Sequence, residues 1–169
     1  ENEEEVFSNM NVLKFGGSSV GTPESILNVK NIVEATARPA VVVVSALGGV
    51  TDQLIAASRM AAAGDSAYSE SVDSLMERHH KMVNAVIEPR RRPQLLENLD
   101  HLLTDLRSIL HGVFLIQDLT PKTADAIVAY GERLSSLITA ALLDNACHVD
   151  SLDVVCTHVQ NGKTLVDFE

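Results

Sequence analysis

The sequence predicts an α/β domain with a mainly parallel sheet. Residues 11–15 are an apolar segment typical of a buried strand, and residues 40–44 include four consecutive valines. Between them, residues 23–37 place apolar side chains at helical spacing. A parallel strand that is covered on both faces has such a continuous apolar run, and a helix is the usual crossover between two such strands. With 169 residues, of which 46% are hydrophobic, the chain is long enough to bury a core.

The segment at the end of the first predicted strand is the most informative one. Lys14 closes an apolar strand, and Gly16, Gly17 and Ser18 follow almost at once. Glycines let the backbone approach an anion closely, and their N–H groups can point into one space. The segment is neither a Walker A loop, in which the lysine follows the glycines, nor a G-x-G-x-x-G fingerprint. We therefore expect a phosphate-binding loop of another kind; the alternative is a strand-to-helix turn whose glycines serve only geometry.

A second glycine-rich loop is predicted after the valine strand. The first loop leads into the helix over 23–37, because Thr22 and Pro23 are suited to its N-cap and first position. Residues 45–52 again combine glycines with hydroxyl side chains and lead into a helix over about 51–63. In open α/β sheets, ligands bind beyond the carboxyl ends of the strands. We therefore expect the two loops to be neighbours.

The following part of the chain has a mostly helical pattern. Helices are predicted over 67–87, 93–111 and 121–145, and residues 149–159 return to the composition of a strand. The helix over 121–145 has one apolar stripe, and Glu132 lies roughly 140° away from its centre at about 100° per residue. Taken alone, this periodicity predicts that Glu132 is a solvated carboxylate.

Composition and charge exclude several classes of function. The formal net charge of −10 argues against nucleic acid as a partner. Residues 1–10 contain four glutamates without periodicity, and we expect a flexible lead or a cloning remnant outside the fold. Cys147 and Cys156 lack the spacing of a zinc site, so we expect free, partly buried thiols in a reducing compartment. The apolar run over 39–50 is too short for a membrane helix, and we therefore expect a cytoplasmic protein.

Three motifs, in their order along the chain, closely resemble those of the aspartate kinase family. The resemblance covers about residues 11–169 and implies the amino acid kinase fold, a three-layer αβα sandwich with a mainly parallel sheet. It also implies that these residues are the amino-terminal portion of a catalytic domain, truncated before its second half. Whether a homoserine dehydrogenase follows is not decided by these residues. The motifs are Lys14-Phe15-Gly16-Gly17-Ser18-Ser19, then Val44-Ser45-Ala46 through Gly49-Val50-Thr51-Asp52, then Gly131-Glu132-Arg133-Leu134-Ser135.

The resemblance implies transfer of the ATP γ-phosphate to the side-chain carboxylate of L-aspartate, with Mg²⁺. This phosphotransferase reaction gives 4-phospho-L-aspartate and opens the biosynthesis of lysine, threonine and methionine. Carried over by position, Lys14 would hold and neutralise the transferring phosphates, with Gly16, Gly17 and Ser18 forming the loop around them. Phosphoryl transfer needs positioned reactants and neutralised charge more than a covalent nucleophile, so these residue types suit the reaction.

The resemblance also assigns the substrate side of the site. Ser45 and Thr51 would bind aspartate, and Glu132 would pair with its α-ammonium group, which reverses the expectation from periodicity. No residue of the chain is assigned to a metal. Because family members are generally oligomers, we expect a homo-oligomer. Because a family catalytic domain extends further, we expect these 169 residues to be weakly active or inactive on their own.

Two alternatives remain open at the level of sequence. Another amino acid kinase, acting on glutamate or acetylglutamate, would share the fold, but the motif around Glu132 belongs with the aspartate enzymes. The other alternative is a non-catalytic domain that binds an anion or a partner protein. Replacement of Lys14 distinguishes the latter, because an anion loop loses ATP or phosphate affinity when its lysine is removed.

Overall fold

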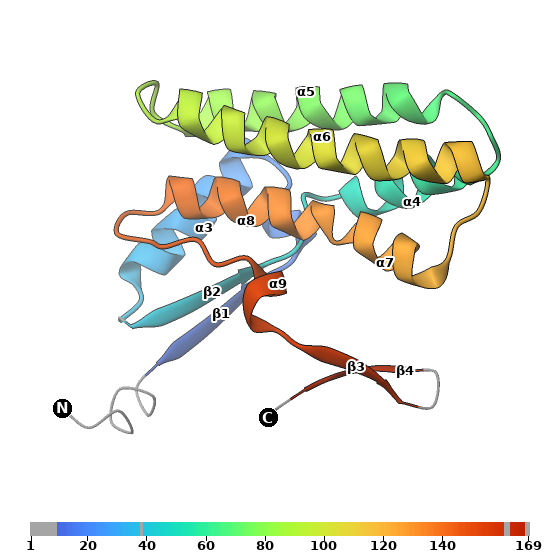
Figure 1. Ribbon diagram of the computed structural model, residues 1–169. Helices are drawn as coiled ribbons and strands as arrows, with labels where there is room; N and C mark the ends of the chain where they lie inside the picture. Colours follow the sequence, from blue (N-terminus) through green and yellow to red (C-terminus); the bar gives the residue numbers. More distant parts are fainter. Residues whose placement is uncertain (1–9, 38, 161–162, 168–169) are drawn as a thin grey trace.

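The structure, a computed structural model, describes residues 10–37, 39–160 and 163–167 (Figure 1). Except for Met10, the expected flexible lead over 1–10 lies outside the described residues. Strands β1 (Asn11–Phe15) and β2 (Ala40–Val44) pair in parallel, as predicted.

The crossover between these strands is formed by helix α3 (Pro23–Ala35). The Thr22 hydroxyl accepts a hydrogen bond from the Ser25 N–H at 3.2 Å, and Pro23 occupies the first turn, so the predicted helix start is confirmed. The short helix α2 (Gly17–Val20) precedes it and was not predicted. The first glycine loop is therefore a tight helical turn.

The remaining helices form a bundle above the sheet (Figure 1). Two boundaries differ from the prediction: α6 continues past residue 111, and the helix predicted over 121–145 is divided at Ala129. Leucine-rich faces of these helices supply most of the core, and none of the described helices is long and apolar enough to cross a membrane. The bundle consists of α4 (Val50–Ala62), α5 (Tyr68–Val86), α6 (Arg92–Ile116), α7 (Pro121–Val128) and α8 (Tyr130–Leu142).

The sheet buries only one of its faces against the described residues. Leu13 and Val42, which are partners in the register, pack against the core. On the opposite face, Val12, Val41 and Val43 are 67%, 43% and 43% exposed. The expectation that the valine strand is covered on both faces is therefore wrong for this part of the chain. The physical reason is that α3 and the bundle helices lie on the same side of the strands (Figure 1).

The last described segment departs most from the prediction. Residues 149–159 were expected to be a strand, but α9 (Ser151–Val154) forms first, capped by the Asp150 side chain, which accepts from the Leu152 N–H at 3.1 Å. Strands β3 (Thr157–Gln160) and β4 (Lys163–Val166) then pair as an antiparallel hairpin that projects from the bundle (Figure 1). Cys147 and Cys156 flank α9 and are free, but both are exposed rather than partly buried as expected.

Candidate functional site

The two glycine loops lie against each other, as the sequence predicts. The Gly48 N–H donates to the Gly17 carbonyl at 3.1 Å, and the Ser45 N–H donates to the Phe15 carbonyl at 3.0 Å. A Cβ on Gly17 would lie 3.0 Å from the Ala46 carbonyl oxygen, so glycine permits this close approach. Both loops follow directly from parallel strands and therefore share one edge of the sheet.

Lys14 and three hydroxyl side chains at this edge are available to a ligand. Lys14 is exposed, and no carboxylate of the described residues lies within ion-pair distance of it. Within the same described part of the chain, the hydroxyls of Ser18, Ser45 and Thr51 have no hydrogen-bond partner. A positive charge and hydroxyl groups that are not used by the protein can serve an anionic ligand.

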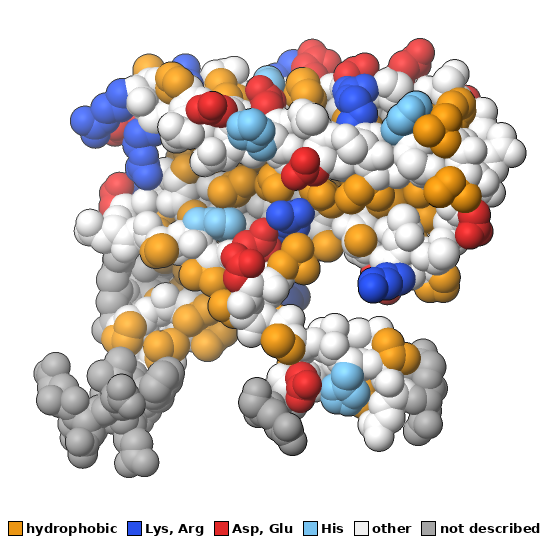
Figure 2. Space-filling view, viewed as in Figure 1, with side chains coloured by type: hydrophobic (Ala, Val, Ile, Leu, Met, Phe, Trp, Pro, Cys, Tyr) orange, Lys and Arg blue, Asp and Glu red, His pale blue; other side chains and the backbone are white. Residues whose placement is uncertain are grey.

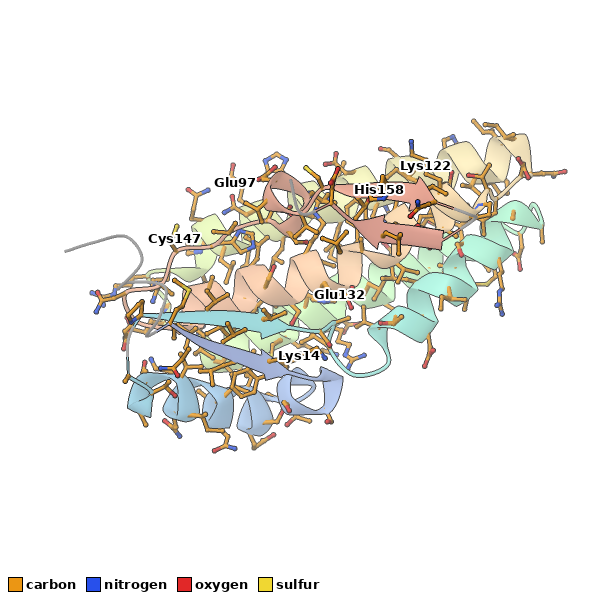
Figure 3. The ribbon with its side chains drawn as sticks, turned by 90° about the horizontal axis from the view of Figure 1, so that it is seen from below. Lys14, Glu97, Lys122, Glu132, Cys147 and His158 are labelled. Atoms are coloured by element: carbon orange, nitrogen blue, oxygen red, sulfur yellow. The ribbon has the colours of Figure 1, made fainter. Side chains whose placement is uncertain are left out.

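Glu132 reaches the second loop from α8. Its Oε1 accepts a hydrogen bond from the Ala46 N–H at 3.3 Å, and the side chain is half-buried. Gly131 makes this approach possible, because a Cβ there would lie only 2.7 Å from the Cβ of Ala46. The expectation of a solvated carboxylate is therefore wrong, whereas the placement beside the second motif agrees with the resemblance. Figure 3 shows Lys14 and Glu132 at the end of the sheet where β1 and β2 terminate.

A groove of about 690 Å³ opens beside Glu132, between β2, α8 and the segment over 144–155. Its walls are mostly apolar on the sheet side, and Figure 2 shows hydrophobic side chains gathered over the sheet. Of the site residues that the sequence predicts, only Glu132 lines this groove. The groove therefore adjoins the loops and does not contain Lys14.

An ion pair at the groove was not predicted from the sequence. Arg133 Nε donates to Asp150 Oδ2 at 2.8 Å, and its guanidinium lies 4.8 Å from the centre of the Tyr130 ring. Burial by itself would raise the pKa of Asp150, but the hydrogen bonds from Arg133 and from the Leu152 N–H outweigh it and lower the pKa. The pair ties α9 to α8. In the sequence, the position of Arg133 directly after Glu132 was the signal that could have placed this arginine near the site.

The adjacent histidines on α5, His79 and His80, contact different partners. His79 is fully buried and its Nδ1 bonds the Leu75 carbonyl at 2.7 Å, whereas His80 Nε2 lies 2.7 Å from Asp100 Oδ1. Desolvation lowers the pKa of His79 to about 4, so its ring is neutral at pH 7. The described residues contain no group of three or more histidine, cysteine or acidic side chains suited to a metal ion.

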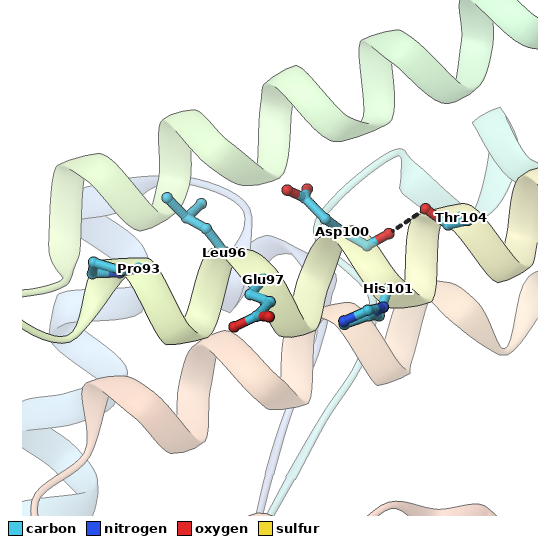
Figure 4. Close-up of a pocket in the computed structure, with 6 residues that line it drawn as sticks. All are labelled: Pro93, Leu96, Glu97, Asp100, His101 and Thr104. Carbon is cyan, nitrogen blue, oxygen red and sulfur yellow. Dashed lines mark hydrogen bonds between the residues drawn. The ribbon is translucent and has the colours of Figure 1, made fainter.

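A second hollow, of about 510 Å³, lies on the outer surface of α6 (Figure 4). All of its lining residues belong to this one helix, so no groups from separate elements converge on it, and we assign it no function. The lining residues are Pro93, Leu96, Glu97, Asp100, His101 and Thr104.

Comparison with known sequences decides the family. The profile of the amino acid kinase family matches residues 9–165. This chain belongs to the amino acid kinase family. The aspartokinase of Candida albicans is 29% identical over 155 residues, covering 85% of this chain and 28% of that protein. Aspartokinase 1, chloroplastic, of Arabidopsis thaliana is 30% identical over 134 residues, covering 79% and 23%. The bifunctional aspartokinase/homoserine dehydrogenase, chloroplastic, of Daucus carota is 30% identical over 131 residues, covering 77% and 14%.

Solved structures confirm the predicted amino acid kinase fold. Aspartokinase III of E. coli, in complex with aspartate and ADP, superposes with a TM-score of 0.69 at 24% identity, covering 79% of this chain and 28% of that chain. The aspartate kinase of Clostridium acetobutylicum gives a TM-score of 0.67 at 22% identity, covering 85% and 31%. This chain thus spans only 14% to 28% of the length of the three curated relatives.

Proposed function

We propose that residues 11–169 are the amino-terminal portion of the catalytic domain of an aspartate kinase. The enzyme would transfer the γ-phosphate of ATP to the side-chain carboxylate of L-aspartate, giving 4-phospho-L-aspartate and ADP. Family membership and the named relatives support this proposal. The observation that carries it is the contact of Glu132 with the Ala46 N–H, because this contact brings the third motif onto the second, which itself lies against the first.

The phosphate side of the proposed site is the first glycine loop. Lys14 would hold and neutralise the transferring phosphates, and Gly16, Gly17 and Ser18 would surround them. Two features of the chain support these roles: the described residues offer Lys14 no carboxylate partner, and a side chain on Gly17 would crowd the second loop. A preorganised cation and a loop with accessible N–H groups stabilise the charge that develops on a phosphoryl group during transfer.

The aspartate side of the proposed site is formed by Ser45, Thr51 and Glu132. A carboxylate that already accepts a backbone N–H is held in place, and its remaining lone pairs can accept from the α-ammonium group of aspartate. The substrate's side-chain carboxylate is ionised at neutral pH, so the reaction needs orientation and no general base. One of its oxygens forms the new bond to the γ-phosphorus, the bond from that phosphorus to the bridging oxygen breaks, and ADP leaves.

The residues of the site fit ATP accompanied by Mg²⁺. Magnesium usually retains several waters and is held by substrate phosphates with few protein carboxylates, so the residues that hold the phosphates would also position the ion. When bound, the ion would neutralise charge on the phosphates. Lys14 and the first loop would position those phosphates for attack.

The proposed activity also implies a pathway, an oligomeric state and a compartment for the enzyme. The reaction would be the first step of lysine, threonine and methionine biosynthesis. A homo-oligomer is supported by the exposed valines of the sheet, because apolar surface of this kind tends to associate. A reducing compartment such as the cytoplasm is supported by the two free cysteines, whereas several plant relatives are named chloroplastic.

The experiment that tests this function measures aspartate-dependent ADP release with Mg-ATP, with hydroxylamine trapping the acyl phosphate. Isothermal titration with Mg-ATP and with L-aspartate accompanies it, so that a chain without turnover still gives a result. Lys14→Ala should weaken Mg-ATP binding about tenfold or more, because a charge-assisted contact is lost. Lys122→Ala, an exposed lysine on α7, is the matched control and should leave Mg-ATP binding unchanged. Equal Mg-ATP affinity in Lys14→Ala and the unmodified chain would contradict the phosphate role.

A further inference from the structure

Backbone hydrogen bonds anchor most of the second glycine loop, which we define as residues 45–49. The N–H groups of Ser45 and Gly48 donate to the carbonyls of Phe15 and Gly17, at the start of the first loop. Its middle is tied to α8 through the Ala46 N–H and Glu132. The Gly49 carbonyl accepts the Gln53 N–H at 3.1 Å as α4 begins. The Val50 N–H donates to the Leu47 carbonyl at 2.9 Å and closes a turn around Gly48 and Gly49. The peptide between these two glycines is the central one of that turn, and such a peptide can adopt two orientations, so the partner of the Gly48 carbonyl bears on which one is adopted.

Arg78 on α5 is the side chain that binds this carbonyl. Its Nη2 donates to the Gly48 oxygen at 2.6 Å, across 30 residues of sequence. Arg78 is half-buried, and no carboxylate of the described part of the chain forms an ion pair with it. A half-buried guanidinium directed at one carbonyl makes a charge-assisted hydrogen bond that fixes the direction of that carbonyl.

The direction of the Gly48 carbonyl sets the direction of the next N–H. In a planar trans peptide the carbonyl and the following N–H point in opposite directions, so the Gly49 N–H is turned away from Arg78. Among the described residues this N–H has no acceptor. Gly49 has a φ of 84°, and a rotation of this peptide plane would move it to a φ that glycine also adopts readily. Two consecutive glycines therefore leave two peptide orientations accessible, and the bond from Arg78 favours one.

We propose that Arg78 is a positioning residue, which holds the peptide between Gly48 and Gly49 so that the Gly49 N–H serves as a donor to a carboxylate of the substrate. This inference rests on the proposed function, in which the same loop carries Ser45 and leads to Thr51. The guanidinium acts through the loop and does not itself touch the substrate. It adds a backbone donor to the hydroxyls and the Glu132 carboxylate that would bind L-aspartate.

The test compares Arg78→Met, which retains the aliphatic stem, with Arg78→Lys, which retains a charged donor. The matched control is Arg107→Met, because Arg107 also anchors α5, through Ser69 at 2.7 Å and Asp73 at 2.5 Å, but does not contact the loop. Titration gives the affinities for L-aspartate and for Mg-ATP separately. The residual dipolar coupling of the Gly49 N–H reports the orientation of the peptide without any ligand.

Arg78→Met should change the Gly49 coupling and weaken L-aspartate binding about tenfold, with less than about a twofold effect on Mg-ATP. Arg78→Lys should restore most of the affinity for aspartate, and Arg107→Met should match the unmodified chain in all three measurements. An unchanged Gly49 coupling in Arg78→Met overturns the inference, and so does an equal loss of affinity for both ligands. If the unmodified chain binds neither ligand, the proposed function fails, while the coupling still decides whether Arg78 orients the peptide.

Discussion

The carboxylate of Glu132 accepts the Ala46 N–H at 3.3 Å, although the two residues are 86 positions apart in the sequence. The contact joins the start of α8 to the loop after β2. It places a half-buried negative charge beside hydroxyl groups that the protein does not use. Binding of an amino acid's ammonium group is the chemistry that this arrangement favours.

Glu132→Gln should separate the charge of this side chain from its structural contact. The amide oxygen can still accept the Ala46 N–H, but the negative charge is absent. We expect L-aspartate affinity to fall about tenfold to a hundredfold, since a hydrogen bond to a charged group contributes about 1.5–3 kcal/mol. Titration with L-aspartate measures this, with the exposed Glu97→Gln as control. An unchanged affinity for L-aspartate in Glu132→Gln would show that the charge of Glu132 does not bind the substrate.

Gly131→Ala should destabilise the fold, whereas Gly112→Ala should stabilise it. A Cβ on Gly131 would lie 2.7 Å from the Ala46 Cβ and 3.4 Å from side-chain carbons of Leu54 and Val50. Forcing this methyl into a packed contact typically costs about 1–3 kcal/mol. On Gly112, in the interior of α6, a Cβ meets no atom within 4 Å, so alanine should add about 0.5–1 kcal/mol through helix propensity. Urea unfolding of both variants checks the opposite signs; destabilisation by both would contradict the packing argument.

His79 should make the stability of the protein depend on pH. Desolvation lowers the pKa of His79 to about 4, below the unfolded value of about 6.5. Between these values the unfolded chain takes up a proton that the folded chain does not, so stability falls as the pH is lowered. From about pH 7 to about pH 5 this contribution is on the order of 2 kcal/mol. His79→Leu should lose this component of the pH dependence, measured by urea unfolding at both pH values, whereas the exposed His101→Leu should keep it. Parallel pH profiles for His79→Leu and the unmodified chain would refute this assignment.

Asp150→Asn should loosen the connection of α9 to α8. The Arg133 guanidinium loses its anionic partner, and a charge-assisted hydrogen bond of this kind contributes about 1.5–3 kcal/mol. Because the folded pKa of Asp150 is lowered, the stabilisation is present above the unfolded pKa and is lost as the pH falls through the folded one. Hydrogen exchange over residues 144–155 measures the effect at neutral pH. The control is Asp153→Asn, because Asp153 is an exposed residue of the same short helix and forms no ion pair within the described residues. Equal exchange rates in both variants would show that the ion pair does not stabilise the segment over 144–155.

Much of the fold follows from signals that act over a few residues. The valine run and the apolar segment over 11–15 predicted β2 and β1 with their observed ends, because β-branched and apolar residues favour strands. Thr22, followed by Pro23, predicted the start of α3, because capping depends only on the first turn. The motif resemblance predicted the family, which the profile match over 9–165 confirms.

Tertiary structure alone decided the contact of Glu132 with the Ala46 N–H, the contact of Arg78 with the Gly48 carbonyl and the open face of the sheet. Periodicity placed Glu132 away from the apolar stripe of its helix, and only the packing of Gly131 on Ala46 turns that face toward the second loop. Arg78 gave no local signal, because its partner is a backbone carbonyl 30 residues away. The physical reason is the same in each case: propensity and capping depend on near neighbours in the chain, whereas these contacts exist only once separate helices and strands have packed.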